Sequence, residues 1–396
     1  MLLPRTLHVL AATAAVVLAL APAASADKLV HPLCPAAQDP HQIATPDGRP
    51  FFVLSDTAWK MWYRLTRPEI DRYLADRARR GFNVVNVWVY DHVRQTRDGQ
   101  QAFVGYDVDR PNEQFWQLVD YTFERAQHYG LRLGIVPMWA SYVTGVYAAP
   151  GDPIMLRDPA TAWRYGQFLG RRYRDFGPIW IIGGEGSARF GGGEDTTPIW
   201  AALAQGLADG TKLGGADGVF TVFHPWALST PPSSSTDFQN APWLDAHGIH
   251  SSHFRARGDQ NWKYVLDDFF RQPVRPIWDL ESQYEDHPVD FGASPGVFST
   301  ADARTRMYAG VFAGAAGANF TNHAIWQFAD PAVPDLQPES LPSPVPWQDA
   351  LSSPGYRQAV YLKRLMLSRP YFGRRPDELL RASPPGDGAA RVGALR

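Results

Sequence analysis

The chain has 396 residues, of which 45% are hydrophobic, so it can build one barrel-sized core or two smaller ones. It carries 38 Lys and Arg against 40 Asp and Glu, a formal charge of −2, which argues against a nucleic-acid or anionic-lipid partner. The 14 tryptophans suit a cleft that stacks on flat, apolar faces such as those of sugars, although core packing accounts for most of them.

The N-terminus has the pattern of a secretory signal peptide, predicted to cover residues 1–26. Arg5 precedes an apolar run at residues 9–21, and Ala-Ser-Ala at 24–26 supplies a small-residue cleavage site. The apolar run is too short for a transmembrane helix, and no later stretch qualifies. We therefore expect a secreted protein, either extracellular or periplasmic according to the host. Cys34 is the only cysteine, so no internal disulfide is possible and the core must hold the fold.

After the signal, short β-prone apolar runs alternate with segments of helical periodicity. The first helix is predicted to open at Thr66, with Glu69 as its capping-box partner, and to close at Gly81. The predicted strands cover residues 51–54, 82–90, 131–139, 178–185, 218–223, 243–254, 274–280 and 320–328. The predicted helices cover residues 66–81, 112–129, 159–176, 199–207, 261–270, 301–316 and 354–368.

Eight strands that alternate with helices predict an α/β fold, and the number eight favours a closed (β/α)8 TIM barrel over an open sheet. No phosphate-binding glycine fingerprint follows the first strand, which also disfavours the open sheet. We expect a single barrel domain over residues 27–372, with a surface loop at 227–240 and a Pro-rich loop at 330–346. Residues 373–396 are expected to form a short tail that ends in disorder.

Two carboxylates follow predicted strands four and seven. The run Ile179–Ile182 leads through two glycines to Glu185, and Glu281 follows the seventh strand. Because the carboxyl ends of barrel strands share one face, both side chains are expected at the same mouth. Two carboxylates across a small cleft are what glycoside hydrolysis needs: one protonates the leaving oxygen and the other attacks or stabilises the anomeric carbon. Taken alone, Glu185 could equally be a solvated loop residue.

Five motifs, in order along residues 31–372, resemble the apiosidase-like family, glycoside hydrolase family 140. They are FVLSDTAW at 52–59, RGFNV at 80–84, WIIGGE at 180–185, DLESQYE at 279–285, and GAAG at 314–317 with HAIWQ at 323–327. The resemblance implies a barrel that cleaves the bond of the branched furanose apiose in the pectin rhamnogalacturonan II. It places Glu281 on the family's catalytic glutamate. By similarity to the wider clan of retaining glycosidases, Glu281 would be the nucleophile and Glu185 the acid/base.

The chain departs from this family pattern at two points. The strand-four carboxylate of the family is an aspartate, and here it is Glu185, one methylene longer. The longer side chain leaves the proposed chemistry possible but shifts the proton donor, so it affects the prediction of the substrate more than the prediction of the reaction. The family also has a small C-terminal β domain, and residues 373–396 are too few to form it, so the tail is interpreted as a possible remnant.

Further residues near strand ends are predicted to bind substrate. Asp56 could bind a hydroxyl or cap the following helical segment, and Trp139 and Trp326 could stack on a sugar or pack in the core. His250 or His253 could bond a hydroxyl or Glu281. Asp279 could orient Glu281, or serve as the nucleophile in its place. The complete set of predicted substrate-binding residues is Asp56, His92, Trp139, His224, His250, His253, Tyr284 and Trp326.

No cofactor and no metal is expected. His247, His250 and His253 recur at every third residue, but alternation along a strand would not bring all three to one point. The expected partner is an oligosaccharide or polysaccharide, with no nucleic acid, no membrane span and no evident protein partner. Two alternatives stay open: a hydrolase of another furanoside or a β-pyranoside, and a non-catalytic sugar-binding barrel.

Overall fold

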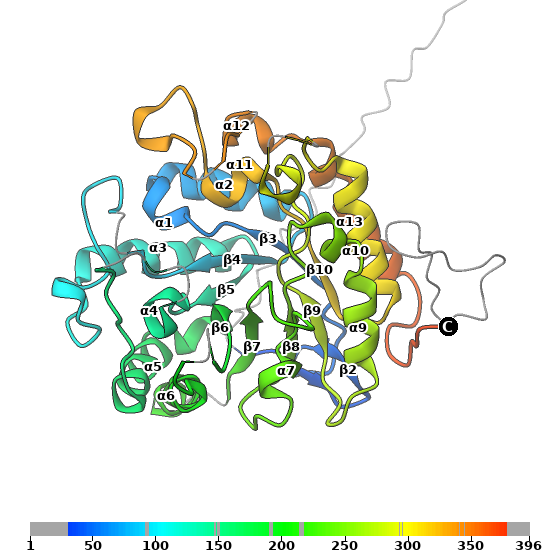
Figure 1. Ribbon diagram of the computed structural model, residues 1–396, viewed down its shortest axis with the longest axis horizontal. Coiled ribbons are helices and arrows are strands. Elements are labelled where there is room, and N and C mark those ends of the chain that lie inside the picture. The colour runs from blue at the N-terminus through cyan, green and yellow to red at the C-terminus, as the bar shows by residue number, and fades with distance from the viewer. Residues whose placement is uncertain are drawn as a thin grey trace, which may run out of the picture.

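A computed structural model describes residues 31–377, apart from 92–94, 146–147, 149–150, 190–192, 214–217, 293, 295, 340 and 344. Eight parallel strands close into a barrel in the order β10-β3-β4-β5-β6-β7-β8-β9, with helices around it (Figure 1). The predicted (β/α)8 fold is therefore confirmed. The strands are β3 (Val53–Thr57), β4 (Val84–Trp88), β5 (Arg132–Val136), β6 (Ile179–Gly186), β7 (Phe220–Pro225), β8 (Ala246–Ile249), β9 (Ile277–Asp279) and β10 (Gly317–Asn319).

Every long predicted helix is present in the outer layer. These are α2 (Arg67–Arg79), α3 (Glu113–His128), α5 (Pro159–Tyr173), α6 (Thr197–Leu213), α9 (Asn261–Phe269), α10 (Thr300–Phe312) and α13 (Pro354–Leu367). The capping box predicted for α2 is formed, and the Thr66 amide donates to Glu69 Oε2 at 2.7 Å. This reciprocal bonding fixes where α2 begins, because it satisfies amides that the helix itself cannot pair.

Shorter helices lie in the connections between strands and long helices. They are α1 (Met61–Arg64), α4 (Ser141–Thr144), α7 (Ser235–Phe238), α8 (Arg255–Gly258), α11 (His323–Gln327), α12 (Trp347–Ala350), and the 3-10 turns η1 (Val104–Tyr106), η2 (Arg174–Phe176), η3 (Val289–Phe291) and η4 (Pro334–Leu336). The loops that follow β7, β8, β9 and β10 contain several of them. These loops at the carboxyl ends of the strands form the face where barrel enzymes place their chemistry.

The last predicted strand, 320–328, is wrong. The eighth barrel strand is β10, three residues earlier, and residues 323–327 form α11 instead. Asn322 caps this helix, since its side chain accepts from the Ala324 amide at 2.9 Å. An apolar run this short fits a strand or a buried helical turn equally well, so periodicity could not separate them.

Two further differences concern the start of the chain and the 227–240 loop. An antiparallel hairpin that the sequence did not indicate, β1 (Cys34–Ala36) with β2 (Asp39–Ala44), precedes the barrel. The 227–240 loop is only partly a surface loop, because Ser233, Ser234 and Ser235 are buried. Among the described residues, no helix is both long and apolar enough to cross a membrane. The predicted signal peptide and residues 378–396 of the predicted tail lie outside the described residues.

Candidate active site

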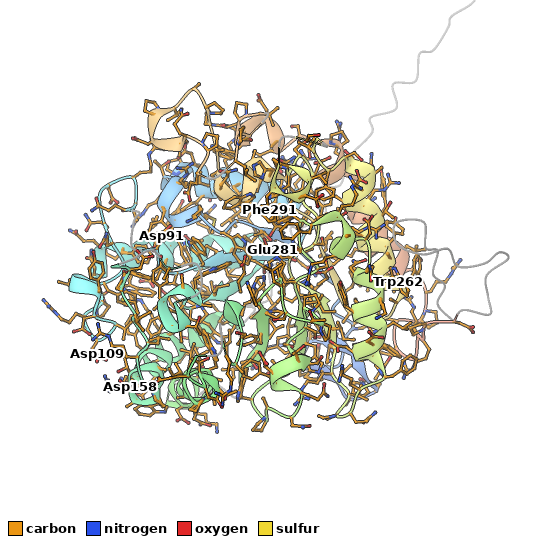
Figure 2. All side chains as sticks on the ribbon, in the orientation of Figure 1. Asp91, Asp109, Asp158, Trp262, Glu281 and Phe291 are labelled. Atoms are coloured by element: carbon orange, nitrogen blue, oxygen red, sulfur yellow. The ribbon has the colours of Figure 1, made fainter. Side chains whose placement is uncertain are left out.

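Both predicted catalytic carboxylates line one cavity of about 450 Å³ at the carboxyl ends of the barrel strands. Glu281 lies two residues after β9 and is only 6% exposed, whereas Glu185 is on the tip of β6 and is half-buried. In Figure 2 Glu281 lies near the centre of the view, over the barrel. The volume is in the range of sites for small ligands.

The tip of β6 is a strained turn that aims Glu185. Gly183, Gly184 and Glu185 all have positive φ angles, of 106°, 50° and 59°. A Cβ on Gly183 would lie 2.7 Å from the His224 carbonyl oxygen, and one on Gly184 would lie 2.7 Å from the Trp139 ring. The two glycines are therefore required by both conformation and space. Glu185 has a Cβ, so its positive φ angle is unfavourable. Strained non-glycine residues of this kind cluster at functional sites.

His224 connects the two carboxylate residues. Its Nδ1 accepts a hydrogen bond from the Glu185 backbone amide at 2.8 Å, so this nitrogen carries no proton. With Nδ1 as an acceptor, the ring proton is on Nε2, which lies 3.2 Å from Glu281 Oε2. His224 itself is fully buried and does not line the cavity. The predicted residue is thus at the site, where it supports the Glu185 backbone and the Glu281 carboxylate and does not line the cavity.

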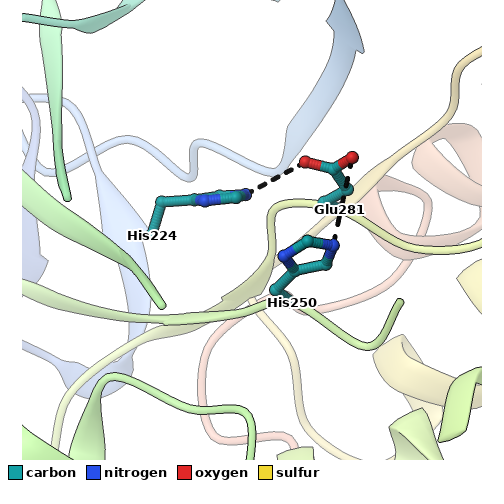
Figure 3. A group of neighbouring side chains, drawn as sticks. All are labelled: His224, His250 and Glu281. Atoms are coloured by element: carbon teal, nitrogen blue, oxygen red, sulfur yellow. Dashed lines mark ion pairs between the residues drawn. The ribbon is translucent and has the colours of Figure 1, made fainter. Parts of the chain in front are cut away.

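Two more histidines face the other oxygen of Glu281. His253 Nε2 is 3.2 Å from Glu281 Oε1 and His250 Nε2 is 3.9 Å from it; Figure 3 shows that His224 and His250 pair with different oxygens of the carboxylate. Burial alone would raise the pKa of Glu281, but His250, His224 and His253 together hold that pKa well below its usual range. Burial lowers the pKa of His250 to about 3, so this ring is neutral at pH 7.

Tyr284 and His287 complete the wall beside Glu281. The Tyr284 ring lies 4.4 Å from that of His253, and His253 stacks on His287 at 3.9 Å with an interplanar angle of 19°. Burial and the nearby Glu281 charge raise the pKa of Tyr284 well above its usual value, which keeps its hydroxyl protonated. His287 was not among the predicted residues, because it follows the strand in an irregular loop where no periodic pattern marks it.

Four tryptophans line the side of the cavity formed by β10, β3, β4 and β5. Trp139, which was predicted, meets Trp88 edge to face at 4.5 Å; Trp88 and Trp59 were not predicted. Trp326 lines the cavity as expected, but from helix α11 and not from a strand end, and its indole N–H donates to His323 Nδ1 at 3.1 Å. A cage of indoles is suited to the apolar C–H faces of a sugar ring.

Asp56 does not belong to the cavity, and the expectation that it binds substrate is corrected. It is fully buried within β3 and faces the helix layer. Its Oδ2 accepts from the Tyr73 hydroxyl at 2.8 Å and from Arg77 at 3.1 Å. Its Oδ1 accepts from the Tyr356 hydroxyl at 2.9 Å and from Thr321 at 3.1 Å. The bonds from Tyr73, Arg77 and Tyr356 join the barrel to α2 and α13, and the bond from Thr321 joins β3 to the segment after β10.

Asp279 also faces away from the position expected for it. Its carboxylate accepts from the Ser251 hydroxyl at 2.8 Å and from Asn261 of α9 at 3.1 Å, so it bonds outward from the barrel. Burial raises its pKa to about 6. Asp279 is therefore not placed to attack a bound sugar. His92, the remaining predicted binding residue, lies outside the described residues.

The histidine triplet seen in the sequence does not converge, because His247 turns to the Ser234 hydroxyl at 3.0 Å. Another set does converge: His224, His250 and Glu281 offer ligand atoms within 4.8 Å of one another. This set does not fit a metal ion, since the Glu185 amide keeps the proton of His224 on Nε2, the atom that would have to coordinate. The arrangement fits a hydrogen-bonded carboxylate better than a metal centre.

Comparison with known proteins identifies the family. A model of the apiosidase-like catalytic domain matches residues 37–373. A solved structure described as a glycoside hydrolase is 31% identical, with 93% of this chain and 81% of that chain covered and a TM-score of 0.80. A glycoside hydrolase family 5 protein from Bacteroides vulgatus is 29% identical, with coverage of 93% and 78% and a TM-score of 0.81. No sequence among the curated proteins matches. The chain is therefore a glycoside hydrolase and belongs to the apiosidase-like family.

Proposed function

We propose that this glycoside hydrolase is secreted and cleaves an apiose-type furanoside linkage in plant cell-wall polysaccharide, with retention at the anomeric carbon. The observation that carries the proposal is the environment of Glu281: an ionised carboxylate, surrounded by histidines, in a tryptophan-lined cavity that also contains Glu185. Membership of the apiosidase-like family supports apiose as the sugar.

In the first step, Glu281 attacks the anomeric carbon and Glu185 gives its proton to the oxygen of the departing group. The bond to the leaving group breaks as the ester bond to Glu281 forms, through a transition state with oxocarbenium character. In the second step, Glu185 takes a proton from water, and that water displaces Glu281. Two inversions return the sugar with its original anomeric configuration.

The histidines suit the nucleophile role of Glu281 because His250, His224 and His253 together lower its pKa. A carboxylate next to an arginine would be held in a strong ion pair, which attack on carbon would have to break. His224 and His253 each place one ring nitrogen 3.2 Å from an oxygen of Glu281. They keep the carboxylate ionised and oriented at neutral pH, and they leave it able to attack the positively charged anomeric carbon of the transition state.

Apiose can be separated from the rival sugars by a product assay. Purified protein is incubated with rhamnogalacturonan II side chains and with oligosaccharides that end in arabinofuranose or a β-linked pyranose, and released sugars are separated by anion-exchange chromatography. We expect free apiose, and none with Glu281→Gln. Release of arabinose or of a pyranose in place of apiose would favour another furanosidase or a β-pyranosidase. N-terminal sequencing of protein from the culture medium tests secretion, with cleavage expected after Ala26.

A further inference from the structure

The segment that follows Glu281 holds the backbone of His287 in one position. The His287 amide donates to the Tyr284 carbonyl at 3.2 Å, and the His287 carbonyl accepts from the Phe298 amide at 2.9 Å. The preceding residue, Asp286, has a positive φ angle of 63°. A non-glycine residue keeps such a conformation only where its surroundings enforce it. The place of His287 in the site is therefore set by the fold.

The His287 ring is also fixed by its neighbours. It stacks on His253 at 3.9 Å, with an interplanar angle of 19°, and meets the rings of His323 and Phe291 edge to face at 4.8 and 5.0 Å. The side chain is buried and nevertheless lines the cavity. Because three rings pack against it, the imidazole presents a constant edge to whatever occupies the cavity.

The tautomer of His287 follows from a single contact. Its Nδ1 lies 2.8 Å from the Pro288 carbonyl oxygen, and a carbonyl can only accept, so Nδ1 carries the proton. Burial lowers the pKa of the ring, and His253 and His323 lower it further, so the ring is neutral at pH 7. A neutral imidazole has one proton. His287 Nε2 therefore carries none and can act only as a hydrogen-bond acceptor.

The other histidines of the site use their ring nitrogens differently. His224, His250 and His253 direct Nε2 toward Glu281, at 3.2, 3.9 and 3.2 Å from its carboxylate oxygens. In His287, Nδ1 is bonded to the backbone, and Nε2 is the nitrogen left for a ligand in the cavity. The donors that a sugar offers are its hydroxyl groups. A buried acceptor whose partner is missing is costly, so a site that contains one discriminates against a ligand without the matching donor.

We propose that His287 is a specificity-determining residue that accepts a hydrogen bond from one hydroxyl of the bound sugar. The inference rests on the proposed function in one respect, that the sugar which Glu281 attacks occupies this cavity. His287 stacks on His253, which contacts Glu281, so the hydroxyl belongs to the sugar whose bond is cleaved. Neither hydrogen nor fluorine at that position can replace the hydroxyl, because neither donates a hydrogen bond.

The test combines His287→Phe with substrates that lack one hydroxyl. Phenylalanine keeps an aromatic ring against His253 and removes the acceptor. We compare kcat/KM for p-nitrophenyl apiofuranoside with that for each of its monodeoxy derivatives. For one hydroxyl, the ratio of parent to deoxy compound should be about threefold to tenfold larger in the wild type than in His287→Phe, as for the loss of one neutral hydrogen bond.

This comparison separates hydrogen bonding from packing. The intrinsic reactivity of each deoxy compound is the same for both proteins and cancels, and a packing defect lowers kcat/KM for both substrates alike. Phe291→Leu, which alters a ring packed on His287 and removes no acceptor, is the control and should leave the ratio unchanged. The fluoro derivative should give the same result as the deoxy compound. A ratio that is equal in the wild type and His287→Phe for every hydroxyl would overturn the proposal.

The outcome is distinguishable from that of the proposed function, because the same derivatives are made on arabinofuranose and xylopyranose. Cleavage of only these compounds would refute apiose, and the hydroxyl ratio would then be measured on the sugar that is cleaved. An equal ratio on that sugar would refute the role of His287 and would leave the identity of the sugar unaffected.

Nitrogen NMR of protein labelled with ¹⁵N-histidine tests the premise without a substrate. The His287 signals are assigned by their absence from the spectrum of His287→Gln. We expect the proton on Nδ1 at pH 7, with Nε2 unprotonated. A proton on Nε2 would make that nitrogen a donor and would overturn the proposal.

Discussion

Asp56 and Glu281 are both buried carboxylates near the carboxyl ends of barrel strands, and their surroundings give them opposite uses. Asp56 is fully buried, and burial raises its pKa, while Arg77 acts in the opposite direction. Glu281 is 6% exposed, and the histidines around it hold its pKa well below the usual range. The first carboxylate has a permanent cation and three hydroxyl donors, whereas the second has titratable rings and a cavity.

The comparison teaches that burial at a strand end does not by itself mark a catalytic residue. The direction of the side chain determines whether the carboxylate can reach a substrate. Asp56 bonds outward to α2 and α13, and Glu281 lines the cavity. The kind of partner then sets what the carboxylate can do. A buried carboxylate paired with a guanidinium is tied into the fold, and removal of either partner is costly. A carboxylate that is oriented by histidine rings and lines a cavity can interact with the charge that develops on a substrate.

The largest expected effect is the loss of activity in Glu281→Gln. The amide cannot form the glycosyl ester, so kcat should fall by about 10⁴-fold or more, as for removal of other enzymatic nucleophiles. The measurement is the initial rate of sugar release, with folding checked by circular dichroism. Glu124→Gln, an exposed glutamate on α3, is the control and should retain full activity. Retention of more than a tenth of the wild-type kcat by Glu281→Gln would refute the assignment.

Glu185→Ala should lower kcat by about 10²- to 10⁴-fold on substrates with poor leaving groups, because general acid catalysis contributes that much. The loss should be much smaller for a dinitrophenyl glycoside, whose leaving group needs no proton, and added azide should restore turnover. Glu194→Ala, an exposed glutamate after the same strand, should behave like the wild type. An equal loss on both substrates would show that Glu185 is not the proton donor.

Asp56→Ala tests the structural half of the comparison. The variant removes the carboxylate 3.1 Å from the buried Arg77, leaves that guanidinium with Asp76 as its remaining carboxylate partner, and should cost about 3–5 kcal/mol in the free energy of unfolding. Urea denaturation provides the measurement. Asp47→Ala removes an exposed ion pair with Arg49 and should change stability by less than about 0.5 kcal/mol. If Asp56→Ala were as stable as Asp47→Ala and lost its activity, Asp56 would have to be reassigned to the substrate.

His253→Phe should produce the smallest of these effects, a fall in kcat/KM of about tenfold to a hundredfold at neutral pH, equivalent to about 1.5–3 kcal/mol. The ring can still stack on His287, but the donor 3.2 Å from Glu281 is lost. Glu281 acts in its ionised form, so activity is present above its pKa and is lost as the pH falls through it.

Removal of a donor raises the pKa of Glu281, so the acidic limb of kcat/KM in His253→Phe should move to higher pH. The same group contributes stability above its unfolded pKa of about 4.3, and this contribution also decreases as the pH falls. His128→Phe, an exposed histidine on α3, should leave the pH profile as in the wild type. An acidic limb that stays in place in His253→Phe would rule out this role of the histidine.

Much of the fold could be predicted because the alternation of strands and helices is a local pattern. The same alternation placed Glu185 and Glu281 at one mouth, since strands four and seven of a closed barrel share their carboxyl face. The direction of Asp56 could not be predicted: the strand was expected to end at residue 54, but β3 continues to Thr57 and sets Asp56 on its outer face. The Asp279 side chain was expected on the same face of the strand as Glu281. Strand alternation does not extend to Glu281, because β9 ends at Asp279.

The details of the site that the sequence did not predict concern the bonding of His224, the backbone at Phe291 and the element that carries Trp326. The tautomer of His224 follows from a bond to a backbone amide 39 residues away. Phe291 lines the cavity and is exposed, and Asp290 and Phe291 both adopt positive φ, which no hydrophobic pattern reports. Trp326 lines the cavity from a different element than expected, since residues 323–327 form α11 and not a strand.

Trapping of the covalent intermediate tests the central claim most directly. A 2-deoxy-2-fluoro glycoside with a dinitrophenyl leaving group should form the ester and release it slowly, because fluorine destabilises both oxocarbenium-like transition states. Digestion and tandem mass spectrometry should then find the fluorinated sugar on Glu281, and proton NMR of the natural reaction should show a product of retained configuration. A product of inverted configuration, with no adduct or with one on another carboxylate, would contradict the account of Glu281 as the nucleophile.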